Sequence, residues 1–400
     1  MSSQIKQMLV MIRANLGSLP RRLWISASMA LSVALAVAIL IGFLAMAAGF
    51  ENTLAGTGST AVAVVLGGGT NQEIDSDVPA DAIRLLQADT GDIGVARDAA
   101  GRLALSRELV VPVEAKRKSD GTERTLALRG MDPAGPALRD HAVLAEGRLF
   151  APGSHEIVVG DRIAREFSGF AVGDTVRLGT IDWTVVGRFV SGGSAFESEI
   201  WGDLDAVQSG FDRQGLVQSL RVRLTGPDGL QALRHALAVF PGAPLVAVSE
   251  ADLYAAQSAR IANLIRLFGW PIALLMAIGA TAGALNTMMS SVSDRTVEIA
   301  TLRTLGFNRV SAFSATWIEA IALAMIGVAI GGVAASVVFD GWQASTVGAN
   351  DSQMAFQLMV TGDVILKAGL VGLATGIVGG ALPAIAASRL PLATALRAKI

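Results

Sequence analysis

Four long stretches of apolar residues, each without a charged side chain, dominate the pattern of the chain. A helix needs about 20 such residues to cross a hydrocarbon core of about 30 Å. The stretches are Leu23–Phe50, Leu267–Ser293, Ala320–Phe339 and Ala368–Ser388. We therefore predict four transmembrane helices, at residues 23–50, 267–293, 310–339 and 368–388. The first follows a basic pair, as a signal peptide would, but it is about twice as long as a signal-peptide core, so we interpret it as a retained span.

The region from 51 to 266 has a different pattern, because it carries 49 of the 66 charged residues of the chain. Short β-branched runs alternate here with amphipathic segments, which predicts an α+β domain. We expect an α+β subdomain at 51–140 and 215–250 and a β-rich subdomain inserted at 141–214. The expected strands are Thr60–Leu66, 156–160, 174–179, 182–190, Gln218–Leu224 and 245–249, and the expected helices are Val78–Gln87 and 229–240.

A stalk helix is predicted at 250–268, where neither glycine nor proline interrupts the helical spacing of apolar residues. It runs directly into the second predicted span. One helix linking the domain to the membrane would transmit force, whereas a break at Gly269–Pro271 would make the segment a plain connector.

Basic residues near the ends of the spans predict the orientation of the chain in the membrane. The lead-in at 1–22 and the tail at 389–400 contain basic residues and no acidic ones, and the loop at 294–309 contains three arginines. The loop at 340–367 carries three aspartates and one lysine. We therefore expect both termini in the cytoplasm, and the 51–266 domain and the 340–367 loop on the outer side of the membrane. The predicted fold is a membrane α-helical fold with a large extracytoplasmic α+β domain.

Composition excludes several classes of function. A formal net charge of −2 gives no electrostatic basis for nucleic-acid binding, and the chain has no cysteine and only three scattered histidines. No H-E-x-x-H motif and no Ser/His/Asp constellation occurs. We therefore predict no catalytic, metal-binding or cofactor-binding residue, and no cofactor.

Small residues spaced four apart in three of the spans predict close helix packing, within one bundle or in a dimer. Glycine is also simply common in membrane helices. The glycines concerned are Gly279, Gly283, Gly327, Gly331, Gly372, Gly376 and Gly380. Glu319, near the inner end of the third span, is interpreted either as a residue at the lipid interface or as a packed polar anchor.

Two segments carry a resemblance to a known family. The loop sequence DRTVEIATLRTLGFNR at 294–309 resembles the cytoplasmic signature of FtsX/MacB-type ABC transporter permeases. The tail sequence PAIAASRLPLATALR at 383–397, with its Pro391 and Arg397, is similar to the family's C-terminal motif. Segments 147–150, 156–160, 173–178 and 184–189 resemble MacB-type periplasmic domains. The resemblance implies that the chain lies in a bacterial inner membrane, with the 51–266 domain in the periplasm. Members with four spans and a separate ATPase include the glycolipid-exporting DevC-type and lipoprotein-releasing LolC/LolE-type permeases.

The resemblance implies that the 294–309 loop is a coupling helix that docks on a cytoplasmic ABC ATP-binding subunit. Its implied coupling residues are Arg295, Glu298, Ile299, Leu302, Arg303 and Gly306. A surface helix lying on membrane lipids, with its arginines toward phosphates, is the alternative for the same residues. No G-x-x-x-x-G-K-[ST] motif occurs and only 22 residues precede the first span, so we expect ATP hydrolysis to reside in a partner chain and this chain not to be an enzyme.

Two functions follow from these expectations. The first is a permease subunit that pairs with a second copy or paralogue and exports or extracts an amphipathic substrate (a drug, peptide, glycolipid or lipoprotein), with a periplasmic adaptor and outer-membrane channel as one variant. The second is an FtsX-like regulator that activates a cell-wall hydrolase and moves no substrate. The long external domain favours transport.

Overall fold

A computed structural model describes residues 2–18, 23–70, 72–239, 244–347 and 353–391 of the chain. The chain divides into two compact units. The helical unit consists of Met1–Ala48, Ala262–Trp342 and Leu358–Ile400, and the sheet unit consists of Gly49–Ile261 and Gln343–Gln357. Each unit is described separately below.

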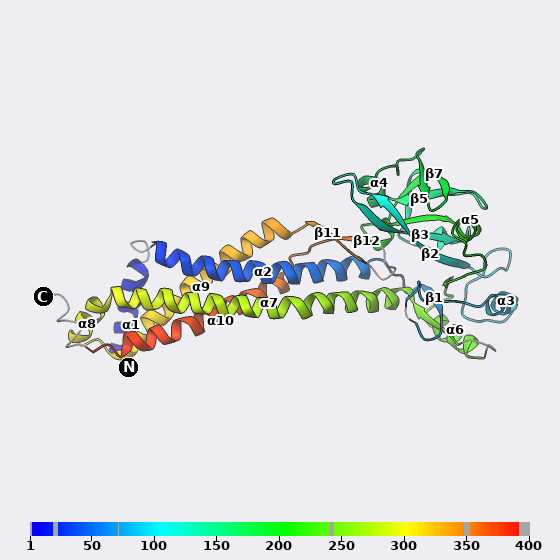
Figure 1. The fold of residues 1–400 in the computed structure, drawn as a ribbon. Coiled ribbons are helices and arrows are strands. Elements are labelled where there is room, and N and C mark those ends of the chain that lie inside the picture. The colour runs from blue at the N-terminus through cyan, green and yellow to red at the C-terminus, as the bar shows by residue number, and fades with distance from the viewer. Residues whose placement is uncertain (1, 19–22, 71, 240–243, 348–352, 392–400) are drawn as a thin grey trace. The chain divides into compact units, whose positions relative to one another are not determined.

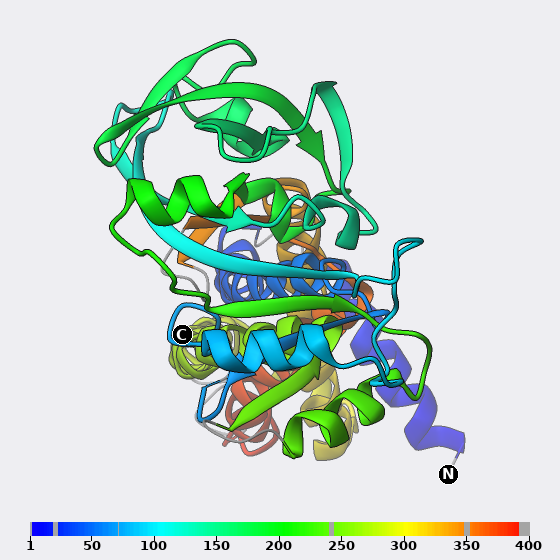
Figure 2. The same cartoon turned by 90° about the vertical axis from the view of Figure 1, so that its right-hand side faces the viewer.

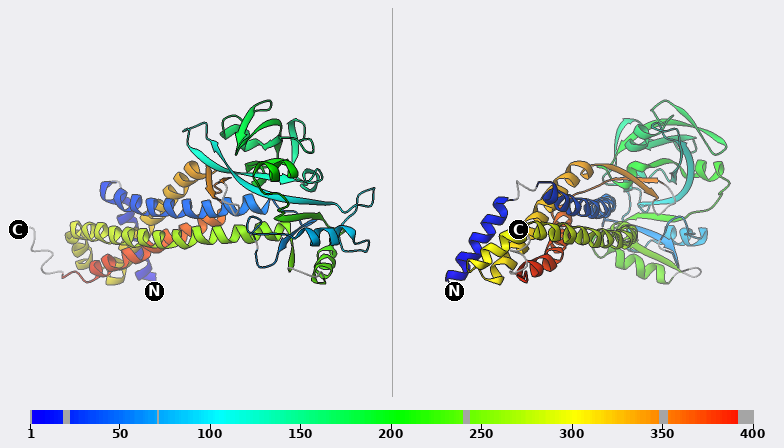
Figure 3. Two further views of the ribbon diagram at one scale, coloured as in Figure 1. Left: turned by 45° about the vertical axis from the view of Figure 1, so that its right-hand side comes forward. Right: turned by 60° about the vertical axis from the view of Figure 1, so that its left-hand side comes forward.

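Four long apolar helices form most of the helical unit (Figures 1 and 3). Among the described residues, they are the four helices long and apolar enough to cross a membrane. Two shorter helices complete the unit: α1 precedes the first long helix, and α8 lies between the second and the third. The helices are α1 (Ser2–Ser18), α2 (Leu23–Ala55), α7 (Glu250–Asp294), α8 (Thr296–Thr304), α9 (Arg309–Phe339) and α10 (Gly362–Ser388).

The core of the helical unit is built from small and branched side chains of α2, α9 and α10. Val33, Val37 and Leu40 of α2 pack with Ala324 of α9 and Ala368 of α10, and all five are buried. Lipid is as apolar as these side chains, so burying them gives little hydrophobic driving force. Close van der Waals packing between the helices stabilises the unit instead.

The segment expected as a stalk and the second span is one helix, α7, from Glu250 to Asp294. Pro271 lies inside this helix and does not end it. A proline removes one intrahelical hydrogen bond, a loss that long apolar helices tolerate. The helix is therefore not broken at Gly269–Pro271, and the alternative of a plain connector is wrong.

The sheet unit is built on one sheet of ten strands (Figure 2). The order is β10-β1-β9-β2-β3-β8-β5-β7-β4, with β6 paired to β7. The strands are β1 (Val62–Gly67), β2 (Leu105–Lys116), β3 (Glu123–Met131), β4 (Val143–Gly147), β5 (Glu156–Gly160), β6 (Thr175–Leu178), β7 (Ile181–Val190), β8 (Glu199–Asp203), β9 (Ser219–Arg223) and β10 (Leu245–Ser249).

Two hydrophobic cores cover one face of this sheet. Alternate residues of the strands point to this face. One core joins β1, β9 and β10 to helices α3 (Ala80–Ala88) and α6 (Gly229–Ala238). The other joins β2, β3, β5, β7 and β8 to helices α4 (Asp161–Glu166) and α5 (Leu204–Gly210).

The boundaries of the subdomains differ from the expected ones. Leu109, Val111 and Val113 of β2 and Leu126 and Leu128 of β3 belong to the second core, although they precede residue 141. β2 has 12 residues and passes from one core to the other. Because of this long strand, the two expected subdomains share one sheet.

The expected loop at 340–367 contains a β-hairpin that belongs to the sheet unit. Its strands are β11 (Gln343–Val347) and β12 (Gln353–Gln357), paired antiparallel. β12 packs against β3 and against η3 (Ala195–Ser198), a turn of 3₁₀-helix. Phe356 is fully buried, and its ring meets that of Phe50 edge-to-face at 5.5 Å. A loop of mixed polarity offered no periodicity from which this hairpin could be predicted.

Candidate functional site

The α8 loop, residues 294–309, contains the coupling residues implied by the sequence. Helix α8 ends before Gly306, whose φ of +99° is the left-handed conformation favoured by glycine after a helix. Asn308 caps α9, since its side chain accepts a hydrogen bond from the Val310 amide at 2.7 Å. The loop thus makes a tight, defined turn between α7 and α9.

One face of α8 packs against its own helical unit. Ile299 is buried with Met11 of α1 and Ala312 of α9, and Leu302 packs at the border of this cluster. The half-buried Arg303 donates from Nη1 to the carbonyl oxygen of Leu390 at 3.0 Å, which ties α8 to the segment after α10. These residues hold the helix in place.

The opposite face of α8 is exposed. Glu298, Thr301 and Thr304 lie on it, and Leu305, just beyond the helix, is 72% exposed. An acidic residue beside a large exposed apolar side chain is a combination suited to contact with another surface. Of the six implied coupling residues, Glu298 and Gly306 lie on the exposed surface of the loop.

Arg295 does not lie on that surface. Arg295 is 4% exposed and forms a bidentate ion pair with Glu319 of α9, which is 3% exposed. Nη1 and Nη2 of Arg295 each lie 3.0 Å from a carboxylate oxygen of Glu319, which also accepts a hydrogen bond from Asn15 of α1 at 3.2 Å. Glu319 is therefore a packed polar anchor, and any part that Arg295 plays in coupling is indirect, through the position of α8.

The predicted glycines fall into two groups. Five of them lie where helices α9 and α10 meet a neighbour inside the helical unit. A Cβ on Gly327 would lie 2.6 Å from the carbonyl oxygen of Ala30 on α2, so no larger residue fits there without movement. By contrast, a Cβ on Gly279 would meet nothing within 4 Å. A Cβ on Gly283, also on α7, would meet Oγ of Ser32 at an ordinary contact distance of 3.7 Å. The five packed glycines are Gly327, Gly331, Gly372, Gly376 and Gly380.

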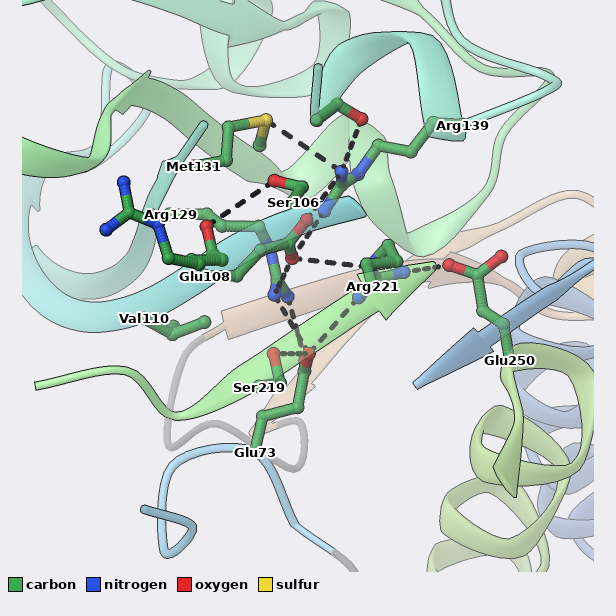
Figure 4. Close-up of polar contacts among 12 residues, drawn as sticks. Glu73, Ser106, Glu108, Val110, Arg129, Met131, Arg139, Ser219, Arg221 and Glu250 are labelled. Carbon is green, nitrogen blue, oxygen red and sulfur yellow. Dashed lines mark hydrogen bonds and ion pairs between the residues drawn. The ribbon is translucent and has the colours of Figure 1, made fainter. Parts of the chain in front are cut away.

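Sequence reasoning missed a buried group of charges in the sheet unit, here named the charged cluster. It lies on the face of the sheet opposite the two cores, and its side chains come from four strands (β2, β3, β8 and β9), from two loops and from the first residue of α7 (Figure 4). Its members are Glu73, Glu108, Arg129, Arg139, Glu199, Arg221 and Glu250, each at most 8% exposed.

Arg129 on β3 is the centre of the charged cluster. Its guanidinium binds both oxygens of Glu73, at 3.1 and 3.0 Å, and both oxygens of Glu199, at 3.0 and 2.7 Å. It also lies 3.0 Å from Glu108. Arg139 then holds the two oxygens of Glu108 at 3.0 and 2.9 Å. Each charge is compensated by opposite charge and by hydrogen bonds, as burial of a charge requires.

Arg221 on β9 joins this group to helix α7. Its guanidinium reaches Glu73 at 3.1 Å and Glu108 at 3.2 Å, and also pairs with Glu250, the first residue of α7. Glu250 in turn accepts a hydrogen bond from the Ser59 amide at 3.0 Å. The helix therefore begins at a buried ion pair within the sheet unit. The sequence signal was a charge at a strand position surrounded by apolar residues, as in QSLRVRL at 218–224.

The charged cluster predicts a loss of stability in acid. Burial raises the pKa of Glu73 and Glu108, but the arginines outweigh it: Arg129 and Arg221 hold the pKa of Glu73 well below its usual 4.5, and Arg139, Arg221 and Arg129 lower that of Glu108 to about 2. Because the unfolded chain binds protons first as pH falls, the stabilisation is complete above pH 4.5 and is lost progressively toward pH 2. Each pKa unit corresponds to about 1.4 kcal/mol. We expect thermal unfolding followed by tryptophan fluorescence to show a steadily falling midpoint from pH 5 to pH 3; an unchanged midpoint would contradict this.

Comparison with known proteins identifies both halves of the chain. The MacB-like periplasmic core domain matches residues 26–239, more than half of the chain, and the FtsX-like permease C-terminal domain matches residues 270–392. The macrolide export ATP-binding/permease protein MacB of Photorhabdus laumondii subsp. laumondii is 24% identical over 234 residues, in an alignment that covers 55% of this chain and 34% of that protein. The chain thus aligns with about a third of its curated relative.

Solved structures of extracytoplasmic domains also match. The extracellular domain of the noncanonic ABC-type transporter YknZ from Gram-positive bacteria has 13% identity and a TM-score of 0.36, covering 47% of this chain and 100% of that chain. The periplasmic region of MacB from Actinobacillus actinomycetemcomitans has 12% identity and a TM-score of 0.37, covering 53% of this chain and 94% of that chain. On the two domain matches, the chain belongs to the FtsX/MacB-type family of ABC transporter permeases.

Proposed function

We propose that this chain is the membrane subunit of an ABC transporter in which a separate cytoplasmic ATP-binding subunit drives motion of the sheet unit. The α8 loop is the coupling element. The observation that carries this proposal is the split of α8 into a face fixed by Ile299 and Arg303 and a free face with Glu298 and Leu305. A helix that must transfer force needs both a rigid seat and an accessible surface.

Helix α7 is the proposed path of that motion. It is continuous from Asp294, next to the α8 loop, to Glu250, which pairs with Arg221. A displacement of the α8 loop would therefore reach the charged cluster along one helix. In this proposal α8 and both termini are cytoplasmic, the sheet unit is periplasmic, and the membrane is the bacterial inner membrane.

The proposed work is export or extraction of a hydrophobic or amphipathic substrate on the periplasmic side, by this chain paired with a second copy or a paralogue. Support comes from the spans. Glu319 is the one charged residue within the described apolar stretches of α2, α7, α9 and α10, at 23–50, 267–293, 310–339 and 368–388, and it is paired with Arg295. These stretches therefore contain no row of charged side chains that would conduct a polar substrate.

Reversing the charge of Glu298 tests the coupling role. Glu298 is exposed, so Glu298→Arg should leave the amount of folded protein in the membrane unchanged, yet weaken co-purification of the ATP-binding subunit by tenfold or more, about 1.4 kcal/mol. The matched control is Asp363→Arg, the same charge change on an exposed residue in the first turn of α10.

Two outcomes would count against the proposal. Normal binding of the ATPase to the Glu298→Arg variant would remove the exposed face of α8 from coupling. A wild-type preparation that carries a cell-wall hydrolase, with ATPase activity indifferent to every amphiphile tested, would replace transport by regulation of that hydrolase.

A further inference from the structure

Part of strand β2 has an open edge. β2 pairs with β3 from Glu108 to Lys116, but with β9 only from Leu105 to Glu108. Beyond Glu108 the chain that contains β9 turns away from β2. The Val110 amide donates a hydrogen bond to Oε1 of the Gln218 side chain at 2.7 Å. At the other end Lys116 is covered again, because its carbonyl accepts a hydrogen bond from the Ser168 amide at 3.0 Å.

The open stretch presents a specific set of backbone groups. Along an antiparallel strand, amides and carbonyls of alternate residues point to the same side. The Val110 amide and the Lys116 carbonyl point away from β3. Pro112 and Glu114 alternate in step with these two residues, so the Pro112 carbonyl and the Glu114 amide and carbonyl also point away from β3. Among the described residues, no partner is assigned on this side to the Glu114 amide or to the carbonyls of Val110, Pro112 and Glu114. Pro112 has no amide, so among the described residues the donors of this edge are the amides of Glu114 and Lys116, which lie among outward carbonyls.

A cleft of about 790 Å³ runs along this edge. Its volume is in the range of ligand sites. The wall opposite Pro112–Lys116 is apolar and includes Phe170, Val176 and Phe211. The rim carries charges of both signs, Glu114, Lys116, Glu123 and Arg177.

The aromatic wall of the cleft is held in position. Phe211 is followed by Asp212, which adopts a left-handed φ of 54°, uncommon for a residue with a side chain. The Phe211 ring lies over Gly179, where a Cβ would approach the ring to 2.8 Å, and Gly179 itself has a φ of +64°. A wall fixed by such backbone geometry needs no rearrangement when a ligand binds.

We infer that this cleft binds an extended segment of a partner polypeptide, which adds to the open edge of β2 as a further strand. Five residues of edge offer about 17 Å, enough for a strand of ordinary length. Main-chain hydrogen bonds supply affinity, and alternate apolar side chains of the segment enter the cleft. The missing amide at Pro112 and the mixed charges of the rim permit few registers, which suits one specific partner segment and not a variable cargo. The inference is independent of the proposed ATPase coupling, because it needs only the sheet unit of the intact chain.

Matched variants of Glu114 test this inference. The full chain, held in lipid nanodiscs, is panned against a phage-displayed library of random nonapeptides, and enriched peptides are synthesised and titrated. Glu114→Pro removes the outward amide in the middle of the cleft edge without removing a bond to β3, whereas Glu114→Ala keeps it. We expect peptides to bind the wild type and Glu114→Ala alike and Glu114→Pro at least about tenfold more weakly.

A second measurement does not depend on the folding of the proline variant. Methylation of alternate peptide nitrogens blocks one edge of the bound strand, so one of the two methylation phases should abolish binding to the wild type while the other leaves it intact. Equal effects of both phases, equal binding to both Glu114 variants when both are folded, or no enriched peptide would overturn the inference. Release of the bound peptide whenever the ATPase turns over would overturn the assignment to a partner and make the peptide a cargo.

Discussion

Replacing Glu319 by alanine should destabilise the helical unit by about 3–5 kcal/mol. The change removes both oxygens that hold the buried guanidinium of Arg295, at 3.0 Å each. An unpaired charge left in an apolar interior costs far more than the pair itself contributes, because water cannot take the place of the carboxylate. The effect is measured as the fraction of SDS, in mixed micelles, at which half of the chain has unfolded.

Two control variants test whether the loss of stability comes from the unpaired charge of Arg295. Removing both charges, with Glu319→Leu and Arg295→Met together, should recover most of the loss, since well-packed apolar residues often replace a buried ion pair at little cost. Lys367→Ala breaks an ion pair whose partners are 54% and 65% exposed, and it should change stability by less than about 1 kcal/mol. Unfolding of Glu319→Ala at the wild-type SDS fraction would show that Arg295 finds another partner or reaches water.

Removing the centre of the charged cluster should have a similar effect on the sheet unit. Arg129→Met deprives Glu73 and Glu199 of two hydrogen bonds each and leaves several buried carboxylates with too little positive charge. We expect a loss of about 3–5 kcal/mol in the free energy of unfolding, against a total of about 5–15 kcal/mol for a typical domain. Trp201 reports on this unfolding, since its Nε1 donates to Glu199 at 3.0 Å and its ring stacks on Phe189.

The control for Arg129→Met is Arg102→Met, which removes an arginine that is 81% exposed and paired with Asp98. That change should cost less than about 1 kcal/mol. If the two variants unfolded at the same urea concentration, the charged cluster would be contributing no more than a surface ion pair.

How far the sequence predicts this molecule depends on whether a signal is local. The long apolar runs and the alternation of apolar and charged residues at 218–224 are local patterns, and the structure has helices and the strand β9 at these positions. Chain order cannot reveal which charges pair: Arg295 has the same neighbours in sequence whether it faces lipid headgroups, a partner or Glu319. The partner 24 residues away decides, and it is visible only once α9 packs beside α7 and α8.

The charged cluster shows the same limit in the sheet unit. Glu73 and Arg221 are 148 residues apart, yet they lie 3.1 Å from each other. Charged residues in strands normally indicate a solvent-facing side, and this expectation hid Glu108, Arg129 and Arg221. The hairpin β11–β12 was not predicted for a related reason. Its buried Phe356 packs against Phe50, which lies about 300 residues earlier in the sequence.

That hairpin has a consequence for how the protein is made. Residues 343–357 leave the ribosome after α2, α7 and α9 have all been synthesised. Until then β12 cannot pack against η3, and Phe356 cannot pack against the Phe50 ring. The sheet unit therefore completes its folding only after the later helices have been synthesised. A soluble fragment ending at residue 261 would stay permanently at this stage, with an apolar surface that the full chain buries.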